Sequence, residues 1–306
     1  MTSGRNPNVD MPSTYIHPSK FADYLSYQQN YCLFLDIDGT LASFTLNPKD
    51  SVIPKTTLIL LKKIQDHGVK IAIVTGRSLI EARQMLSPIQ LPIAATHGLE
   101  IAFDDAEDGD KDSTNIIPIN TTELMAIRQL IIQSCTPYPD LTLEDKPYSV
   151  ALHYRQDPTL ADVANTIVAT VLDRHSDWTV KRGKCVCEVV PKGVNKGAAI
   201  LTLSKQMQTS ETLCPIFIGD DVTDEAGFMA IQAQTQSIEN HEESVTGMGI
   251  KVGSEPTCAQ YYVHSIDEVT GLLDSFLAFC QTRATLSAVS ADAGFPTADK
   301  TVRCLV

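Results

Sequence analysis

Short apolar runs alternate along this chain with longer segments in which apolar residues recur at helical spacing. The run Tyr31–Leu35 is continuous and stops at Asp36, which is typical of a strand buried on both faces of a parallel sheet. Pro54 can open a helix, and Leu58, Leu61 and Ile64 recur at helical spacing on one face. The same patterns predict strands at Val69–Val74, Leu91–Ala95, Cys214–Ile218, Gly249–Val252 and Tyr261–Val263, and helices at Ser78–Leu86 and Asn195–Met207.

This alternation of strand and helix is typical of a doubly wound, Rossmann-like α/β domain with right-handed crossovers. Asp36, Thr75 and His97 each follow a predicted strand. The carboxyl ends of parallel strands meet at one edge of the sheet, where such folds bind ligands. We therefore expect these polar side chains to project from the same edge.

The middle of the chain, from about Asp104 to Cys187, follows another pattern. It opens with an acidic stretch and then shows the period-two alternation of half-buried strands. We expect helices at Leu124–Ser134 and Asp162–Arg174, and strands at Leu141–Glu144, Tyr148–Arg155, Trp178–Val180 and Cys185–Val190.

These two patterns predict an α+β domain inserted into a larger α/β domain. We expect the inserted cap to span residues 105–188 and the core to span 21–104 and 189–282. An insertion above a catalytic edge commonly acts as a lid. Residues 1–20 and 283–306 lack periodicity, so the pattern predicts flexible tails there.

The charge of the chain narrows the class of partner. With 306 residues and a formal net charge of −13, the protein would repel nucleic acid and anionic membrane surfaces. An anionic substrate would need a bound cation, clustered Lys or Arg, or backbone N–H groups to reverse the local field. The eight cysteines are scattered, and we find neither an apolar signal core nor a membrane-spanning run. We expect reduced thiols and a cytoplasmic protein.

Two acidic segments carry the candidate chemistry. Asp36-Ile-Asp38-Gly39-Thr40 places two carboxylates at a strand end, with a glycine that permits a tight turn. Alone, this pair is also compatible with a solvated turn. A second strand, however, ends in Gly-Asp-Asp-Val-Thr-Asp-Glu, which includes Asp220 and Asp224. Two carboxylate clusters at one sheet edge would repel unless a hard divalent cation lay between them, and oxygen ligands of this kind suit Mg²⁺.

Such a site suits hydrolysis of a phosphate monoester. Asp36 can attack phosphorus and form an aspartyl-phosphate, which divides one difficult step into two. Asp38 can protonate the leaving oxygen and later deprotonate the attacking water. Thr75 can offer a hydroxyl and a backbone N–H to a phosphate oxygen, and Lys196 can supply a cation. Lys192 competes with Lys196 for that role, but Lys196 opens a helix.

In this order, DIDGT, VTGR, the late lysine and GDDVTDE resemble the four motifs of haloacid-dehalogenase (HAD) phosphatases. The resemblance implies that Asp36 is the nucleophile, Asp38 the acid and base, Thr75 the second-motif hydroxyl and Lys196 the third-motif lysine. It also implies Mg²⁺ bound by Asp36, the Asp38 carbonyl and Asp220, with Asp224 ranked behind them.

The inserted domain is similar to the cap of the trehalose-6-phosphate phosphatase family in LEDKPYSVALHYRQ and GKCVCEVV. Alternation places Glu144 and Lys146 on one strand face, and His153 and Arg155 on one face of the next strand. The resemblance implies that Glu144, Lys146 and Glu188 hold the glucose unit remote from the phosphate. An exposed ion-pair network is the alternative for these charges.

Other residues are expected to line the site. Arg77 either contacts phosphate or pairs with a carboxylate, and His97 either lines the site or is structural. The remaining candidates are Gly39, Thr40, Gly76, Gly98 and Glu100.

The expected activity is hydrolysis of trehalose 6-phosphate in trehalose biosynthesis, with Mg²⁺ as cofactor. The alternatives are a phosphatase for another sugar phosphate, such as sucrose-phosphate or a glycosyl-glycerate phosphate, a phosphomutase, and a non-catalytic phosphosugar-binding regulator. We expect a small-molecule sugar phosphate as partner, no nucleic acid or membrane, and a monomer or weak oligomer.

Overall fold

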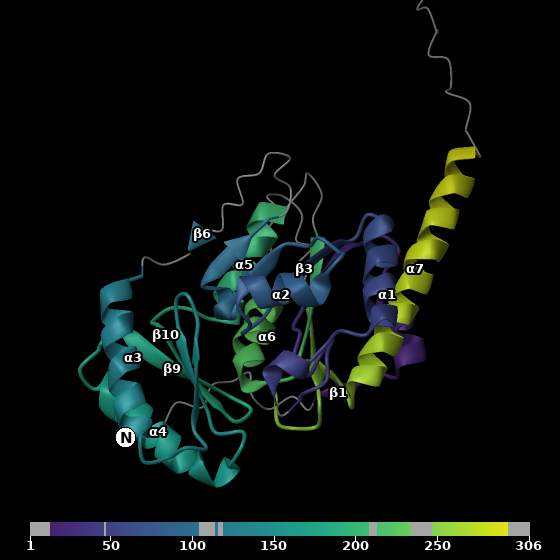
Figure 1. Ribbon diagram of the computed structural model, residues 1–306. Coiled ribbons are helices and arrows are strands. Elements are labelled where there is room, and N and C mark those ends of the chain that lie inside the picture. The colour runs from purple at the N-terminus through teal and green to yellow at the C-terminus, as the bar shows by residue number, and fades with distance from the viewer. Residues whose placement is uncertain are drawn as a thin grey trace, which may run out of the picture.

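Two separate sheets organise the computed structural model, which describes residues 13–45, 47–103, 114–115, 119–207, 213–233 and 247–292 (Figure 1). Nine strands form the larger sheet. Across it they are β1 (Thr14–Tyr15), β13 (Tyr261–Val263), β12 (Met248–Val252), β11 (Leu213–Gly219), β2 (Asn30–Leu35), β3 (Lys70–Val74), β4 (Ile93–Ala95), β5 (Glu100–Ala102) and β6 (Thr114–Asn115).

The larger sheet is parallel from β1 to β4, and β5 near one edge runs antiparallel to both of its neighbours, β4 and β6. Strand β2 lies near its middle, between β11 and β3. Its side chains alternate between two cores, with Leu33 and Leu35 in one and Cys32 and Phe34 in the other. Burial on both faces explains why this strand is apolar without interruption.

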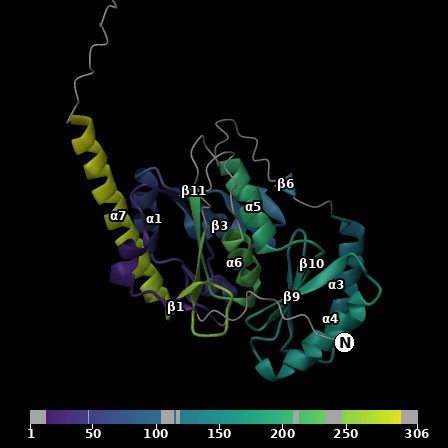
Figure 2. The same ribbon diagram turned by 180° about the vertical axis from the view of Figure 1, so that it is seen from behind.

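Helices cover both faces of the larger sheet. One face carries α1 (Lys55–Asp66), α2 (Leu79–Leu86) and α7 (Ile266–Asp292), and the other carries α5 (Lys196–Met207) and α6 (Glu225–Gln232) (Figures 1 and 2). The predicted doubly wound α/β fold is therefore confirmed. Short 3-10 helices lie at η1 (Pro18–Tyr24), η2 (Pro48–Asp50), η3 (Thr96–Gly98), η4 (Pro158–Leu160) and η5 (Val222–Asp224).

The smaller sheet has four antiparallel strands in the order β7 (Thr142–Asp145), β8 (Val150–His153), β10 (Val186–Pro191) and β9 (Trp178–Gly183). Helices α3 (Thr121–Cys135) and α4 (Ala161–Leu172) pack on it and enclose a core of their own. In both views this sheet lies between its two helices and the larger sheet (Figures 1 and 2).

Ordered structure extends into both segments that we expected to be tails. Strand β1 pairs with β13, and Ile16 and Phe21 are buried in the main core. Helix α7 runs past residue 282, and Arg283 donates a hydrogen bond to the carbonyl of Gln29 at 2.8 Å. The expectation was wrong for residues 13–20 and 283–292, because isolated apolar or charged residues in aperiodic stretches gain partners far away in sequence. Residues 1–12, the acidic stretch 104–112 and residues 293–306 lie outside the described residues.

Within the described residues, no helix combines the length and apolar character needed to cross a membrane.

Candidate active site

Asp36 lies directly after β2, at the carboxyl edge of the larger sheet. Its backbone N–H donates to the carbonyl of Ile218 on β11 at 3.1 Å, and its side chain is almost fully buried. Gly39, three residues on, has φ +76°, and a Cβ there would lie 2.0 Å from Oδ2 of Asp220. Glycine is thus required where the two acidic turns approach each other.

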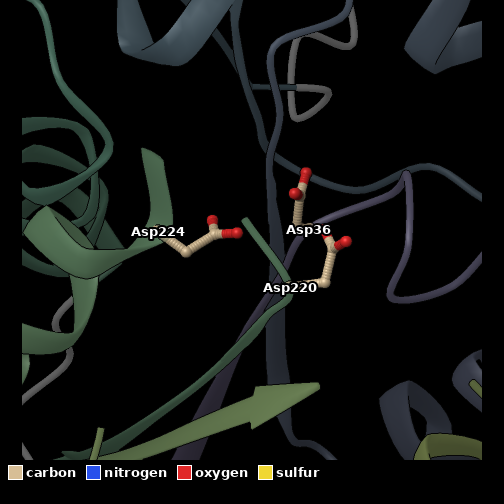
Figure 3. Close-up of side chains that lie close together, drawn as sticks. All are labelled: Asp36, Asp220 and Asp224. Atoms are coloured by element: carbon tan, nitrogen blue, oxygen red, sulfur yellow. The ribbon is translucent and has the colours of Figure 1, made fainter. Parts of the chain in front are cut away.

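Three buried carboxylates converge at this edge (Figure 3). One oxygen from each of Asp36, Asp220 and Asp224 lies within 4.8 Å of the others. Burial raises the pKa of Asp220 to about 6, and burial and the neighbouring carboxylates also raise the pKa of Asp36. A divalent cation would stabilise the charged forms of these clustered carboxylates, and oxygen ligands of this kind suit Mg²⁺. The donor set therefore fits the predicted metal.

Lys196 is the first residue of α5 and points into this acidic cluster. Its Nζ lies 2.7 Å from Oδ2 of Asp36 and 2.7 Å from Oδ1 of Asp224, and the side chain is 2% exposed. Burial alone would lower the pKa of Lys196, but the two carboxylates raise it, so the ammonium stays charged. Lys192, the competing candidate, is exposed.

Both oxygens of Asp224 are engaged by other groups of the protein. Oδ1 accepts from Lys196, and Oδ2 accepts from the backbone N–H of Asp221 at 2.9 Å. Asp220 uses one side-chain oxygen, Oδ2, in a contact with Lys184. This difference suits Asp220 as a metal ligand and Asp224 as the group that holds Lys196.

Asp38 is paired with Arg77. The guanidinium donates from Nε to Oδ2 and from Nη2 to Oδ1, both at 2.7 Å, and Ser51 Oγ lies 3.3 Å from Oδ1. Of the two roles considered for Arg77, contact with phosphate or pairing with a carboxylate, the structure shows the pairing. The Asp38 side chain remains 38% exposed and lines the cavity, so it can turn toward a ligand.

Thr75 is buried beside this pair and does not line the cavity. Its backbone N–H donates to the carbonyl of Ala94 at 2.9 Å, and its Oγ1 accepts from the N–H of Arg77 at 3.2 Å. The backbone N–H expected to meet a phosphate oxygen is therefore already used, because β3 pairs with β4 up to this residue.

The cavity lies between the two sheets, and residues of both line it. From the core come Asp36, Asp38, Gly76, Arg77, His97, Lys196 and Asp220, and from the inserted segment come Glu144, Lys146, His153, Arg155 and Glu188. Six expected residues do not line it. Besides Thr75, they are Asp224, Gly39, Thr40, Gly98 and Glu100, which are buried around the cavity.

A buried ionic network joins the two sheets around Glu188. Its Oε1 accepts from Lys146 Nζ at 3.1 Å and Ser149 Oγ at 2.6 Å, and its Oε2 lies 2.9 Å from His97 Nε2. Lys146 also donates to the carbonyl of Gly76 at 2.8 Å. Burial alone would raise the pKa of Glu188, but Lys146 and His97 lower it. This burial distinguishes the network from the exposed ion pairs considered as the alternative.

Two further contacts come from strand β8 and the residues after it. His153 Nε2 lies 2.7 Å from Oε2 of Glu144. Arg155 Nη1 donates to the carbonyl of Thr45 at 2.6 Å, and its guanidinium lies 3.9 Å above the ring of Phe44. Arg155 thus connects the inserted segment to the loop after Asp38.

Sequence reasoning missed several lining residues: Phe44, Pro48, Glu81, Lys181, Gly183, Lys184, Val186, Asp221 and Thr223. Lys184 matters most, because its Nζ lies 2.5 Å from Oδ2 of Asp220. In the sequence, Gly183-Lys184 lies between two runs of alternating residues, which indicates the tip of a hairpin. This pattern does not indicate which residues the tip contacts.

Comparisons with known proteins bear on this arrangement. The family model for trehalose-phosphatase matches residues 34–267. The chain is 30% identical over 249 residues to trehalose-6-phosphate phosphatase of Escherichia coli, covering 80% of this chain and 85% of that protein. It is 33% identical over 204 residues to a probable trehalose-phosphate phosphatase of Sinorhizobium fredii, covering 66% of this chain and 74% of the relative.

A solved structure shares the fold. The C-terminal domain of trehalose-6-phosphate phosphatase from C. albicans has a TM-score of 0.75 at 20% identity, and the match covers 88% of this chain and 99% of that domain. The resemblance seen in the motifs is confirmed: with a family model that matches most of its length, this chain belongs to the trehalose-phosphatase family.

Proposed function

We propose that this protein hydrolyses trehalose 6-phosphate to trehalose and inorganic phosphate. Membership of the trehalose-phosphatase family supports the substrate. One observation carries the proposal. Three carboxylates converge, and Lys196 contacts one of them, Asp36, where both residues line a cavity with polar walls.

The residues suggest a two-step reaction. A carboxylate oxygen of Asp36 bonds to phosphorus while the bond from phosphorus to the sugar oxygen breaks, and Asp38 gives that oxygen a proton. Asp38 then takes a proton from water as the water oxygen bonds to phosphorus. The bond between Asp36 and phosphorus breaks, inorganic phosphate leaves, and both aspartates are restored.

Lys196 has two tasks in this scheme. Its ammonium opposes the rise in the pKa of Asp36 that burial causes and orients this carboxylate, and Asp224 fixes Lys196 from the other side. We propose that Asp36, the Asp38 carbonyl and Asp220 bind Mg²⁺, with Asp224 behind them. When bound, this ion neutralises phosphate oxygens that would otherwise repel Asp36.

We propose that residues 105–188 act as a cap that selects the substrate. Glu144, Lys146 and Glu188 offer carboxylate and ammonium groups to the hydroxyls of the glucose unit remote from the phosphate. In the structure Lys146 donates to Glu188 and to the carbonyl of Gly76, and Glu144 contacts His153. A sugar that replaces those bonds would hold the cap in place and exclude water.

The same reasoning supports a cytoplasmic enzyme of trehalose biosynthesis, monomeric or weakly oligomeric, that has no nucleic acid or membrane partner. The net charge of −13 disfavours both of those partners.

Phosphate release from trehalose 6-phosphate, sucrose 6-phosphate and glucose 6-phosphate, each with Mg²⁺ or EDTA, tests this proposal. Asp36→Asn is the blank. We expect Mg²⁺-dependent release from trehalose 6-phosphate alone. Release from another sugar phosphate would retain the mechanism and refute the substrate, and no release from any of them would favour a phosphosugar-binding regulator.

A further inference from the structure

Two lysines contact the acidic cluster, and they are held in different ways. Lys196 is 2% exposed and lies on a helix of the core. Lys184 is 46% exposed and lies at the tip of the hairpin between β9 and β10, on the inserted segment. Lys184 can therefore leave Asp220 when the hairpin moves, whereas Lys196 cannot leave Asp36 without disturbing the core.

The hairpin tip is docked on the second acidic turn by its backbone as well. The N–H of Lys184 lies 3.3 Å from Oδ2 of Asp221, and a Cβ at Gly183 would lie 3.0 Å from the same oxygen. Cys185 completes the tight turn with φ +58°. The turn that directs the Lys184 ammonium toward Asp220 is itself held by a contact with the following residue, Asp221.

Docking of Lys184 brings a further positive charge to the acidic cluster. Asp36, Asp220 and Asp224 contribute three negative charges, and Lys196 and Lys184 contribute two of the three positive charges beside them. The third is Lys251, which is buried and donates to the main-chain carbonyl of Asp220. Undocking of Lys184 removes one positive charge from beside Asp220, which favours entry of a cation.

We propose that Lys184 is a tethered cation that competes with a divalent metal ion for Asp220, so that metal binding and docking of the hairpin oppose each other. The inference rests on the metal site of the proposed function. An ammonium and a metal ion on one carboxylate repel at short range. Because coupling between two binding events is reciprocal, Mg²⁺ weakens docking by the factor by which docking weakens Mg²⁺ binding.

Calorimetric titration of the metal-free protein with Mg²⁺ tests this competition. We expect Lys184→Met to bind Mg²⁺ about tenfold more tightly than the native chain, within the usual range of coupling between sites. Lys184→Arg keeps the charge and should bind like the native chain. Lys181→Met is the matched control, because it removes a lysine from the same hairpin that has no hydrogen bond to Asp220.

The outcomes separate this inference from the proposed function. Equal affinity of the native chain and Lys184→Met, or a gain of the same size in Lys181→Met, would overturn the competition and leave the metal site intact. No Mg²⁺ binding by either protein would overturn the metal site and the competition together. Hydrogen exchange gives the reciprocal readout: Mg²⁺ should speed exchange at residues 183–186 in the native chain, and unchanged exchange would refute the coupling.

Discussion

Replacement of Lys196 by methionine removes the ammonium between Asp36 and Asp224 while keeping most of the length of the side chain. At an effective dielectric constant of 20, each contact at 2.7 Å corresponds to about 6 kcal/mol of Coulomb attraction. Desolvation cancels much of this, and loss of one partner from a buried pair costs about 3–5 kcal/mol. We expect the midpoint of thermal unfolding to fall by about 6–10 °C, at about 2 °C per kcal/mol.

Thermal unfolding followed by circular dichroism, with EDTA and then with Mg²⁺, measures this effect. Lys205→Met is the control, because Lys205 is an exposed lysine on the same helix. Mg²⁺ should restore part of the loss in Lys196→Met, since a cation compensates the same carboxylates. A fall in the unfolding midpoint no larger than that of the control would refute the claim that the contacts of Lys196 with Asp36 and Asp224 stabilise the fold.

Three further predictions follow from the buried charges, the acidic turn and the cap. Glu188 has its pKa lowered from the ordinary value of 4.5, so its stabilisation is present above about pH 4.5 and is lost as the pH falls below it. Urea unfolding should show Glu188→Gln less stable than the native chain by about 3 kcal/mol at pH 7, and a difference that persists undiminished at pH 3 would contradict this. Gly39→Ala should displace Asp220 and weaken Mg²⁺ binding in calorimetry at least about tenfold. Gly68→Ala is the control. Gly68 has φ +81° and nothing lies within 4 Å of the added Cβ, so this change introduces only the backbone strain of about 1–2 kcal/mol. Equal effects of these two changes on Mg²⁺ affinity would rule out the steric argument. Glu144→Ala should reduce turnover of trehalose 6-phosphate at least about tenfold while changing that of p-nitrophenyl phosphate less than about threefold, and equal losses in steady-state assays would count against the cap assignment.

The local pattern of apolar residues was sufficient to predict the two strands that carry Asp36 and Asp220. Strand β2 is buried on both faces, so its composition alone indicates a central parallel strand followed by Asp36. The same holds for β11 and Asp220. Because parallel strands share a carboxyl edge, the convergence of the two turns could be predicted without knowing the strand order.

Contacts between distant segments could not be predicted in this way. No periodicity in the stretch around Thr14 indicates that it pairs with Tyr261, since the strand is two residues long. The engagement of the Thr75 N–H depends on the register of β3 against β4, which sequence alone leaves undetermined. The contact of Lys184 with Asp220 depends on how the two sheets are oriented, and alternation within a hairpin carries no information on that.

The short connection from β10 to α5 has a consequence for engineering. Strand β10 carries Glu188, which lines the cavity, and ends at Pro191. Helix α5 begins at Lys196, so four residues join this strand to the helix that presents the lysine. Gly193 within this connection has φ +90°, a conformation that other residues adopt at a cost. A chimera that exchanges the inserted domain for that of a relative must keep the length and the glycine of this joint. Otherwise the exchanged domain will also turn Lys196, the first residue of the helix, away from Asp36.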